Sequence, residues 1–242
     1  MSFVHHYEKN IVGRDFATGD IHGCFKKLRT ELENIGFDPE RDRLFSVGDL
    51  VDCGPDSDLA LEFLEKHWFH AVRGNHEDLA IQYAGGDMIP SYYVENGGAW
   101  NVSNPRDLQV KFADAFACLP IAIEVETDNG LIGIVHADCP FPTWRDFTVS
   151  LDDPNVSGKM RDAMFEAAMW SRERIQIEDH TGIPDVRAVI VGHTPLKRPV
   201  ALGNVYHIDT GAVFRNGYFT FINLATLETL PPMPKKLEWE EA

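Results

Sequence analysis

Residues 43–55 read RLFSVGDLVDCGP, an apolar segment that runs directly into a turn with two aspartates and two glycines. Two other stretches repeat this layout: residues 11–18 run into GDIHG at 19–23, and residues 68–72 run into RGNHE at 73–77. Apolar residues at helical spacing follow the turn at 19–23 and the turn at 48–55. Strand, turn and helix in series predict an α/β fold with parallel strands. The unusual residues lie just past each strand, where open α/β sheets bind ligands.

The second half of the chain mixes both kinds of element. In order we expect a helix over 108–119, a hairpin of 121–127 and 131–135, a loop over 137–157, a helix around 161–174, a buried strand at 186–191, and short strands at 206–208 and 218–222. We predict one domain over residues 1–230 and a flexible C-terminal tail over 231–242.

Composition excludes several classes of protein. The 22 Lys and Arg residues against 38 Asp and Glu give a formal net charge of −16, which disfavours nucleic acid and anionic membranes as partners. No apolar run approaches the roughly 20 residues that cross a bilayer. The first ten residues lack a basic stretch followed by an apolar one, so we expect a cytoplasmic protein. The four cysteines form no C-x-x-C pair and are expected to be free thiols.

Seven Asp, Asn and His residues along the chain are of the types that bind metal ions. In chain order, this series consists of Asp20, His22, Asp49, Asn75, His76, His136 and His193. Carboxylate, amide and imidazole donors together suit Mn²⁺, Fe²⁺ or Zn²⁺. A single histidine beside a glycine is more often an ordinary loop residue, but three of the clusters follow predicted strands in order. Five clusters exceed the needs of one ion, so the sequence predicts a centre with two divalent metals.

The motifs GDIHG, GDLVDCG, GNHE and GHTP, together with His136, resemble the calcineurin-like metallophosphoesterase superfamily. The segments WFHAVRGNHE, NGGAW, HADCPF, WSRERI and IDTGAVF are similar to the bacteriophage lambda-type and bacterial Ser/Thr protein phosphatases. The resemblance extends over roughly residues 13–222. It implies the family's α/β sandwich, in which helices flank two central mixed sheets.

The resemblance also implies a role for each residue of the series. Asp20 and His22 would hold the first metal, Asp49 would bridge both, and Asn75, His136 and His193 would complete the second. His76 would be the general acid, with Asp52 orienting it. Two ions would lower the pKa of a water that attacks phosphorus, while His76 protonates the leaving alkoxide. The family pattern favours Mn²⁺, with Fe or Zn as alternatives.

Two arginines are candidates for binding the substrate phosphate. Arg73 stands directly before Gly74, and its guanidinium fork suits a phosphate oxygen. Arg172, in WSRERI, matches the family's second substrate-binding arginine. The alternative for Arg172 is an exposed helix face on which it pairs with Glu173 or Glu178.

Cys53 departs from the family motif GDxVDRG, whose arginine binds the substrate phosphate. Losing one charge-assisted hydrogen bond costs about 1.5–3 kcal/mol, which is roughly tenfold to over a hundredfold in rate or binding. We therefore predict weakened but retained activity. A thiol with a lowered pKa near two cations is a second hypothesis for Cys53, and an inert side chain is a third.

Three functions remain in competition. The first is a Ser/Thr protein phosphatase that hydrolyses phosphomonoesters on a phosphorylated protein or peptide. The second is a symmetrical dinucleoside polyphosphate (Ap4A) hydrolase, which shares GD-x-HG and GNHE. The third is a pseudophosphatase that binds phosphoproteins without turnover, and Cys53 alone favours it. The sequence leaves the oligomeric state open.

Overall fold

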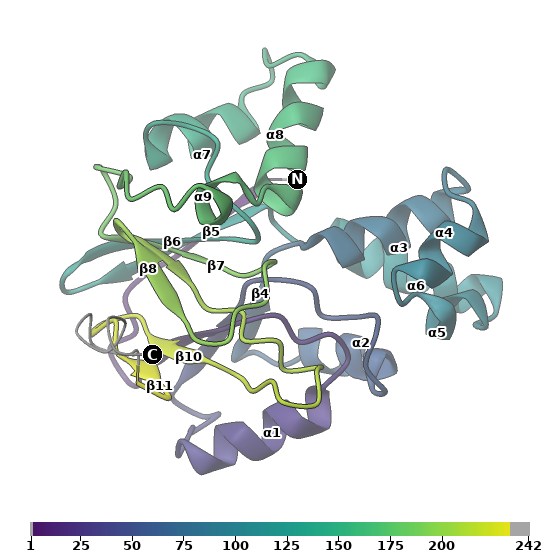
Figure 1. Ribbon diagram of the computed structural model, residues 1–242, viewed down its shortest axis with the longest axis horizontal. Helices are drawn as coiled ribbons and strands as arrows, with labels where there is room; N and C mark the ends of the chain where they lie inside the picture. The colour runs from purple at the N-terminus through teal and green to yellow at the C-terminus, as the bar shows by residue number, and fades with distance from the viewer. Residues whose placement is uncertain (1, 233–242) are drawn as a thin grey trace.

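The computed structural model describes residues 2–232 and consists of two facing β-sheets with helices outside them (Figure 1). The larger sheet has the order β1 (Val4–Tyr7), β5 (Ala122–Thr127), β6 (Gly130–Val135), β7 (Ala188–Val191), β9 (Val205–His207) and β8 (Val200–Leu202). The smaller has the order β11 (Thr229–Leu230), β10 (Phe221–Asn223), β2 (Asp15–Thr18), β3 (Arg43–Ser46) and β4 (Phe69–Ala71). Each sheet contains parallel and antiparallel pairs, so the predicted sandwich of two mixed sheets is confirmed.

Three groups of helices surround the sheets (Figure 1). They are α1 (Phe25–Asn34) and α2 (Ala60–Leu64); α3 (Asn75–Gly85), α4 (Pro90–Glu95), α5 (Ala99–Val102) and α6 (Arg106–Ala117); and α7 (Trp144–Asp152), α8 (Gly158–Trp170) and α9 (Glu173–Gln176). Among the described residues, none of these helices is long and apolar enough to span a membrane.

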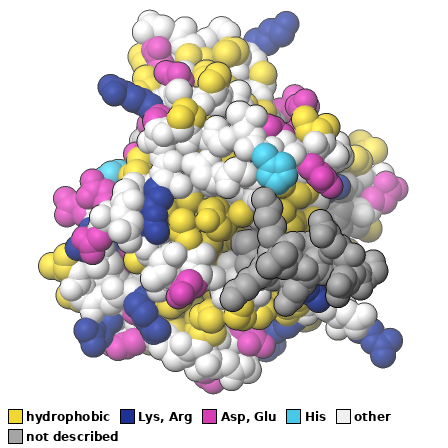
Figure 2. Space-filling view, turned by 60° about the vertical axis from the view of Figure 1, so that its left-hand side comes forward, with side chains coloured by type: hydrophobic (Ala, Val, Ile, Leu, Met, Phe, Trp, Pro, Cys, Tyr) yellow, Lys and Arg dark blue, Asp and Glu magenta, His cyan; other side chains and the backbone are white. Residues whose placement is uncertain are grey.

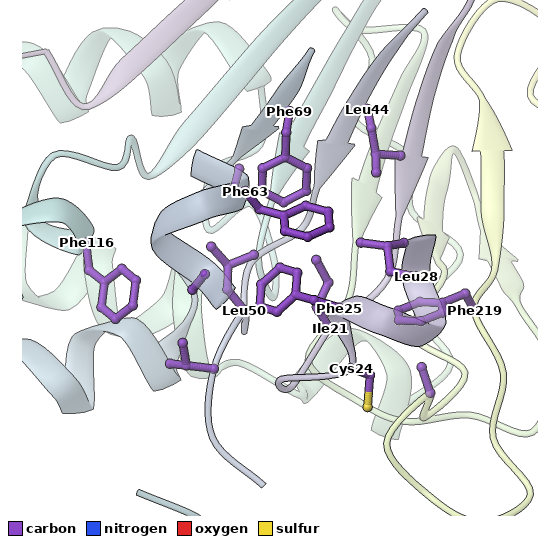
Figure 3. Close-up of a cluster of buried hydrophobic side chains, with 14 of the residues drawn as sticks. Ile21, Cys24, Phe25, Leu28, Leu44, Leu50, Phe63, Phe69, Phe116 and Phe219 are labelled. Atoms are coloured by element: carbon purple, nitrogen blue, oxygen red, sulfur yellow. The ribbon is translucent and has the colours of Figure 1, made fainter. Parts of the chain in front are cut away.

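The apolar core is layered. Side chains of both sheets, including Phe45 and Ile190, form a middle layer between them. On the outer face of the smaller sheet, Phe25 of α1 and Phe63 of α2 pack with Phe69 of β4 (Figure 3). Burying one such side chain contributes roughly 1.5–3 kcal/mol, so these layers hold the strand ends in place.

Parallel pairing brings the predicted functional turns to one edge. Strands β2, β3 and β4 are parallel, with Thr18 opposite Ser46 and Ser46 opposite Ala71. The turns that follow them therefore leave the sheet side by side. Strands β6 and β7 are parallel as well, and they lead to His136 and His193 on the facing sheet.

One predicted element is wrong. The segment 137–157 was expected to be a loop, but it contains the helix α7. The Thr143 side chain caps this helix by accepting a hydrogen bond from the Asp146 amide, and Trp144, Phe147 and Leu151 are buried beneath it. The Pro and Asp residues around α7 obscured this helical spacing of apolar residues.

One predicted helix differs from the structure at its end, and one strand of the structure was not predicted. The predicted helix around 161–174 ends at Trp170 because Ser171 is extended, and α9 begins only at Glu173. Strand β1, which the composition of the N-terminus did not indicate, pairs in parallel with β5. Residues 233–242 of the predicted tail lie outside the described part of the chain.

On the face shown in Figure 2, basic and acidic side chains are interspersed.

Candidate metal centre

Asp49 lies at the centre of the site. Its Oδ2 atom is 3.6 Å from Nε2 of His22, 3.4 Å from Nε2 of His136 and 3.8 Å from Nε2 of His76. His22, Asp49 and His76 form one group of potential metal ligands, and Asp49, His136 and His193 form another. The carboxylate shared by both groups has the position that a bridging ligand needs.

The second group has the spacing of a coordination sphere. Oδ1 of Asn75 is 2.9 Å from Nε2 of His136 and 2.9 Å from Nδ1 of His193, and these two nitrogens are 3.2 Å apart. Ligand atoms about 2.1 Å from one ion lie about 3 Å from each other, so the three donors fit a common cation.

Asp20 lies on the other side of Asp49. Its Oδ2 atom is 4.0 Å from Nε2 of His22, and both of its oxygens accept from the backbone N–H of His193 at 3.1 Å. A Cβ at Gly192 would stand 2.1 Å from the Asp20 carboxylate, and one at Gly74 would stand 2.3 Å from that of Asp49. Only glycine fits these two positions beside the carboxylates.

Backbone carbonyls orient the histidine rings. Nδ1 of His22 donates to the Val51 carbonyl at 3.1 Å, and Nδ1 of His136 donates to that of Val47 at 2.7 Å. These bonds fix a proton on Nδ1, so Nε2, which faces Asp49, is the nitrogen that would bind a metal. Such an outer hydrogen bond is the usual support of a metal-bound imidazole.

Buried carboxyl groups crowd the centre. Burial and the neighbouring Asp209 and Asp49 raise the pKa of Asp20 well above its usual value. Burial and Asp49 raise the pKa of Glu77 to about 7. Burial also opposes the charge of Asp49, but the surrounding histidines, His136 foremost, hold its pKa well below the ordinary value. A cluster of this kind is stabilised by divalent cations.

Backbone strain concentrates at the same place. Seven non-glycine residues of the described chain have positive φ, and five of them belong to these turns: His22, Asp49, Asp52, Cys53 and His193. Left-handed φ at such residues costs of order 1–3 kcal/mol each and persists only where the surroundings enforce it. The strain marks this edge of the sheets as the functional one.

Glu77 holds two of the turns together. Its buried carboxylate accepts from the backbone N–H groups of Asp49 at 2.9 Å, Leu50 at 2.8 Å and Gly74 at 2.9 Å. The first two donors follow β3 and the third follows β4. Glu77 therefore sets the spacing between the Asp49 turn and the start of α3.

His76 and Asp52 form a second functional pair. Nδ1 of His76 is 2.8 Å from Oδ2 of Asp52. The other oxygen of Asp52 accepts from the indole N–H of Trp100 at 2.6 Å and from the Tyr93 hydroxyl at 3.2 Å. Sequence reasoning assigned no function to Tyr93 or Trp100, although NGGAW among the resemblance motifs contains Trp100. Burial opposes the charge on His76, but Asp49 and Asp52 outweigh it and raise its pKa to about 9.

The two arginines differ in their surroundings. The Arg73 side chain is 8% exposed and donates to the carbonyls of Ala117 at 2.7 Å and Leu119 at 3.4 Å, so it anchors the end of α6. Nε of Arg172 lies 3.2 Å from Nε2 of His193, at the border of the metal centre. The structure thus brings Arg172 to the site, whereas Arg73 is engaged by backbone carbonyls.

All four cysteines are free, and Cys53 is exposed whereas Cys24 and Cys139 are buried. Burial and the carboxylates of Asp52 and Asp49 raise the pKa of Cys53 to about 11. The hypothesis of a lowered thiol pKa concerns the protein with two cations bound, and it stays a prediction. The residue remains the site of the missing family arginine.

The chain has two mixed sheets and two groups of potential metal ligands that share Asp49. These features are those of a dinuclear metallohydrolase. Residues 16–197 match the family model of the calcineurin-like phosphoesterases, and the chain belongs to this family.

The similarity to known proteins differs in extent from one relative to another. The chain is 38% identical over 202 residues to Serine/threonine-protein phosphatase 1 of Salmonella typhimurium, covering 82% of this chain and 87% of that protein. A symmetrical bis(5'-nucleosyl)-tetraphosphatase of Aromatoleum aromaticum is 47% identical, but only over 74 residues, or 29% of this chain and 27% of that protein. A solved structure titled as a putative diadenosine tetraphosphatase has a TM-score of 0.65 at 20% identity, with 95% of this chain and 96% of that one covered, and it supports the fold.

Proposed function

We propose that the protein is a metal-dependent Ser/Thr protein phosphatase that hydrolyses phosphomonoesters on phosphorylated proteins or peptides. The observation that carries this proposal is the double set of ligands around Asp49 with the His76–Asp52 pair beside it. The long alignment with a Ser/Thr protein phosphatase supports the substrate class. The alignment with the symmetrical tetraphosphatase of Aromatoleum aromaticum covers only 29% of the chain, so the symmetrical dinucleotide activity is the weaker candidate.

Asp20, His22 and Asp49 would hold one cation, and Asp49, Asn75, His136 and His193 the other. When bound, two divalent ions lower the pKa of water for attack on phosphorus and neutralise the phosphoryl oxygens. The mixed oxygen and nitrogen donors suit Mn²⁺, with Fe or Zn as alternatives, because an all-oxygen set would favour Mg²⁺. The substrate phosphate is a dianion, and the chain has a net charge of −16. The two cations would supply the local positive charge that the phosphate needs.

His76 supplies the proton. Asp52 accepts from Nδ1 of His76, which leaves Nε2 to donate to the leaving alkoxide of phosphoserine or phosphothreonine. The bonds from Trp100 and Tyr93 hold the Asp52 carboxylate, and through it the plane of the imidazole. No covalent phosphoenzyme is needed.

Arg172 is the better placed of the two candidate phosphate ligands. Nε2 of His193 faces both the Trp170 carbonyl and Nε of Arg172, each at 3.2 Å. A single nitrogen cannot donate to the first and accept from the second. If Nδ1 of His193 held a metal, Nε2 would carry the proton and donate to the Trp170 carbonyl, and Arg172 would be available for a phosphate oxygen. We place the enzyme in the cytoplasm, which the four free cysteines support.

The test is a turnover assay on chelated protein. Mn²⁺, Mg²⁺, Zn²⁺ or Ca²⁺ is added back, and phosphate release from a phosphoserine peptide is compared with hydrolysis of diadenosine tetraphosphate. We expect Mn²⁺ to restore peptide turnover and the peptide to be preferred. A strong preference for the dinucleotide would transfer the function to the rival hydrolase. Tight peptide binding without turnover under any metal would instead support the pseudophosphatase.

A further inference from the structure

A cleft with a volume of about 520 Å³ opens between α3 and α4 on one side and α8 on the other. Its lining residues are Asp78, Gln82, Tyr92, Asp162, Phe165, Glu166, Met169 and Trp170. Figure 1 shows α8 at the top of the view and the α3–α6 group at the right, so the two walls of the cleft belong to different groups of helices. The cleft is part acidic and part aromatic, and among residues 2–232 no Lys or Arg lines it.

Both walls of the cleft begin at the metal centre. Helix α3 starts with Asn75 and His76, and Asp78 follows within its first turn. Helix α8 ends at Trp170, whose carbonyl lies 3.2 Å from Nε2 of His193 and whose ring centroid is 6.1 Å from that of the His193 ring. A peptide whose phosphorylated residue reaches the metal centre therefore has this cleft next to it.

Three carboxylates face the cleft. Asp162 and Glu166 stand one turn apart on α8 and are exposed. Asp78, on the opposite wall, accepts from the Gln82 amide at 2.6 Å. No ion pair joins any of the three to a basic residue within residues 2–232. The Asp78 charge interacts with that of the buried Arg73, whereas the charges of Asp162 and Glu166 are free for an external cation.

We propose that this cleft is a specificity subsite that binds a Lys or Arg side chain near the phosphorylated residue of the substrate. The aromatic rings of Tyr92, Phe165 and Trp170 pack against the aliphatic stem, and the carboxylates pair with its charged end. This inference rests on the proposed phosphatase function and adds a preference for basic phosphopeptides. Electrostatic complementarity of this kind contributes mainly to selection between partners.

The test compares two phosphoserine peptides that differ only in two flanking positions, which are Arg in one and Ala in the other. For the native chain with Mn²⁺ we expect kcat/KM to be about three- to tenfold higher for the Arg peptide, mostly through KM, because exposed charge pairs are individually weak. The preference should shrink when the salt concentration is raised to about 1 M, where screening acts within about 3 Å.

The variant Asp162→Asn/Glu166→Gln should lose most of this preference and keep its rate on p-nitrophenyl phosphate, which is too small to reach the cleft. A matched control, Glu33→Gln/Glu40→Gln, removes the same charge from exposed positions around α1 and should keep the preference.

Equal rates on the two peptides, or a preference that survives in the cleft variant, would overturn the subsite. A preference lost equally in the control would assign it to net charge and would overturn the subsite as well. If neither peptide is hydrolysed while diadenosine tetraphosphate is, the proposed function fails first, and the subsite fails with it.

Discussion

At the scale of single residues, catalytic strength depends on contacts that the motifs only partly specify. Position 53 has a left-handed backbone with φ of 66° and a side chain that reaches the surface. Its Sγ atom is 3.9 Å from the Asn96 carbonyl. This is one of the weakest contacts at the site, so a longer side chain can replace the thiol without leaving a buried group unpaired.

Cys53→Arg should therefore raise kcat/KM on a phosphopeptide about tenfold to a hundredfold, because it restores a charge-assisted bond to the phosphate. Steady-state kinetics with saturating Mn²⁺ measure the change. Cys118→Arg, at another exposed cysteine, adds the same charge away from the centre and should leave the rate unchanged. Identical kinetics for native and Cys53→Arg enzyme would contradict the importance of the missing arginine.

Trp100 is a positioning residue for the general acid. Trp100→Phe removes the 2.6 Å hydrogen bond to Asp52, and such a bond to a charged group contributes about 1.5–3 kcal/mol. We expect kcat to fall at least about tenfold with KM little changed, and the basic limb of the pH–rate profile to shift. Trp68→Phe is the control, because Trp68 packs against the hydrophobic core. Loss of activity with an unshifted pH profile would point to a purely structural role.

At the scale of elements, the site exists because turns follow parallel strands. The neighbouring ends of β2, β3 and β4 present their turns at one edge, and β6 and β7 present His136 and His193 from the other sheet. The Glu77 carboxylate ties the turn after β3 to the start of α3. Its three backbone bonds make the spacing of these elements depend on one side chain.

Glu77→Gln should accordingly weaken metal binding about 10- to 100-fold, the usual effect of losing an outer support of a metal site. An amide offers one acceptor oxygen, and its NH₂ group would face backbone N–H donors. Calorimetric titration with Mn²⁺ measures the affinity. Glu33→Gln on the exposed face of α1 serves as the control. Unchanged affinity would show that the turns keep their spacing without Glu77.

At the scale of the whole molecule, the interior holds neutral histidines as well as acids. Burial and Arg174 lower the pKa of His207 to about 4, and both of its ring nitrogens are buried without a hydrogen-bond partner. A folded-state pKa below the unfolded value of about 6.5 means that this histidine stabilises the fold fully above pH 6.5. The contribution is lost as the pH falls from 6.5 toward 4.

His207→Leu should make the free energy of unfolding less sensitive to pH in this window, by up to about 1.4 kcal/mol per pH unit. Urea unfolding of chelated protein at several pH values between 4 and 7 gives the comparison. His67→Leu, at an exposed position, should retain the native slope. Parallel stability curves for native and His207→Leu protein would refute the assignment.

The sequence by itself determined the class of fold, the hairpin at 121–135 and the series of ligand-type residues, because strand patterns, Gly-rich turns and donor types are local properties. The tertiary structure alone decided which side chains meet. It bonded Arg73 to a backbone carbonyl at the end of α6 and placed Arg172 beside His193. It gave Asp52 its hydrogen-bond donors from α4 and α5. It also formed the acidic cleft between α3 and α8. These outcomes depend on contacts between residues far apart in the chain, which no local pattern specifies.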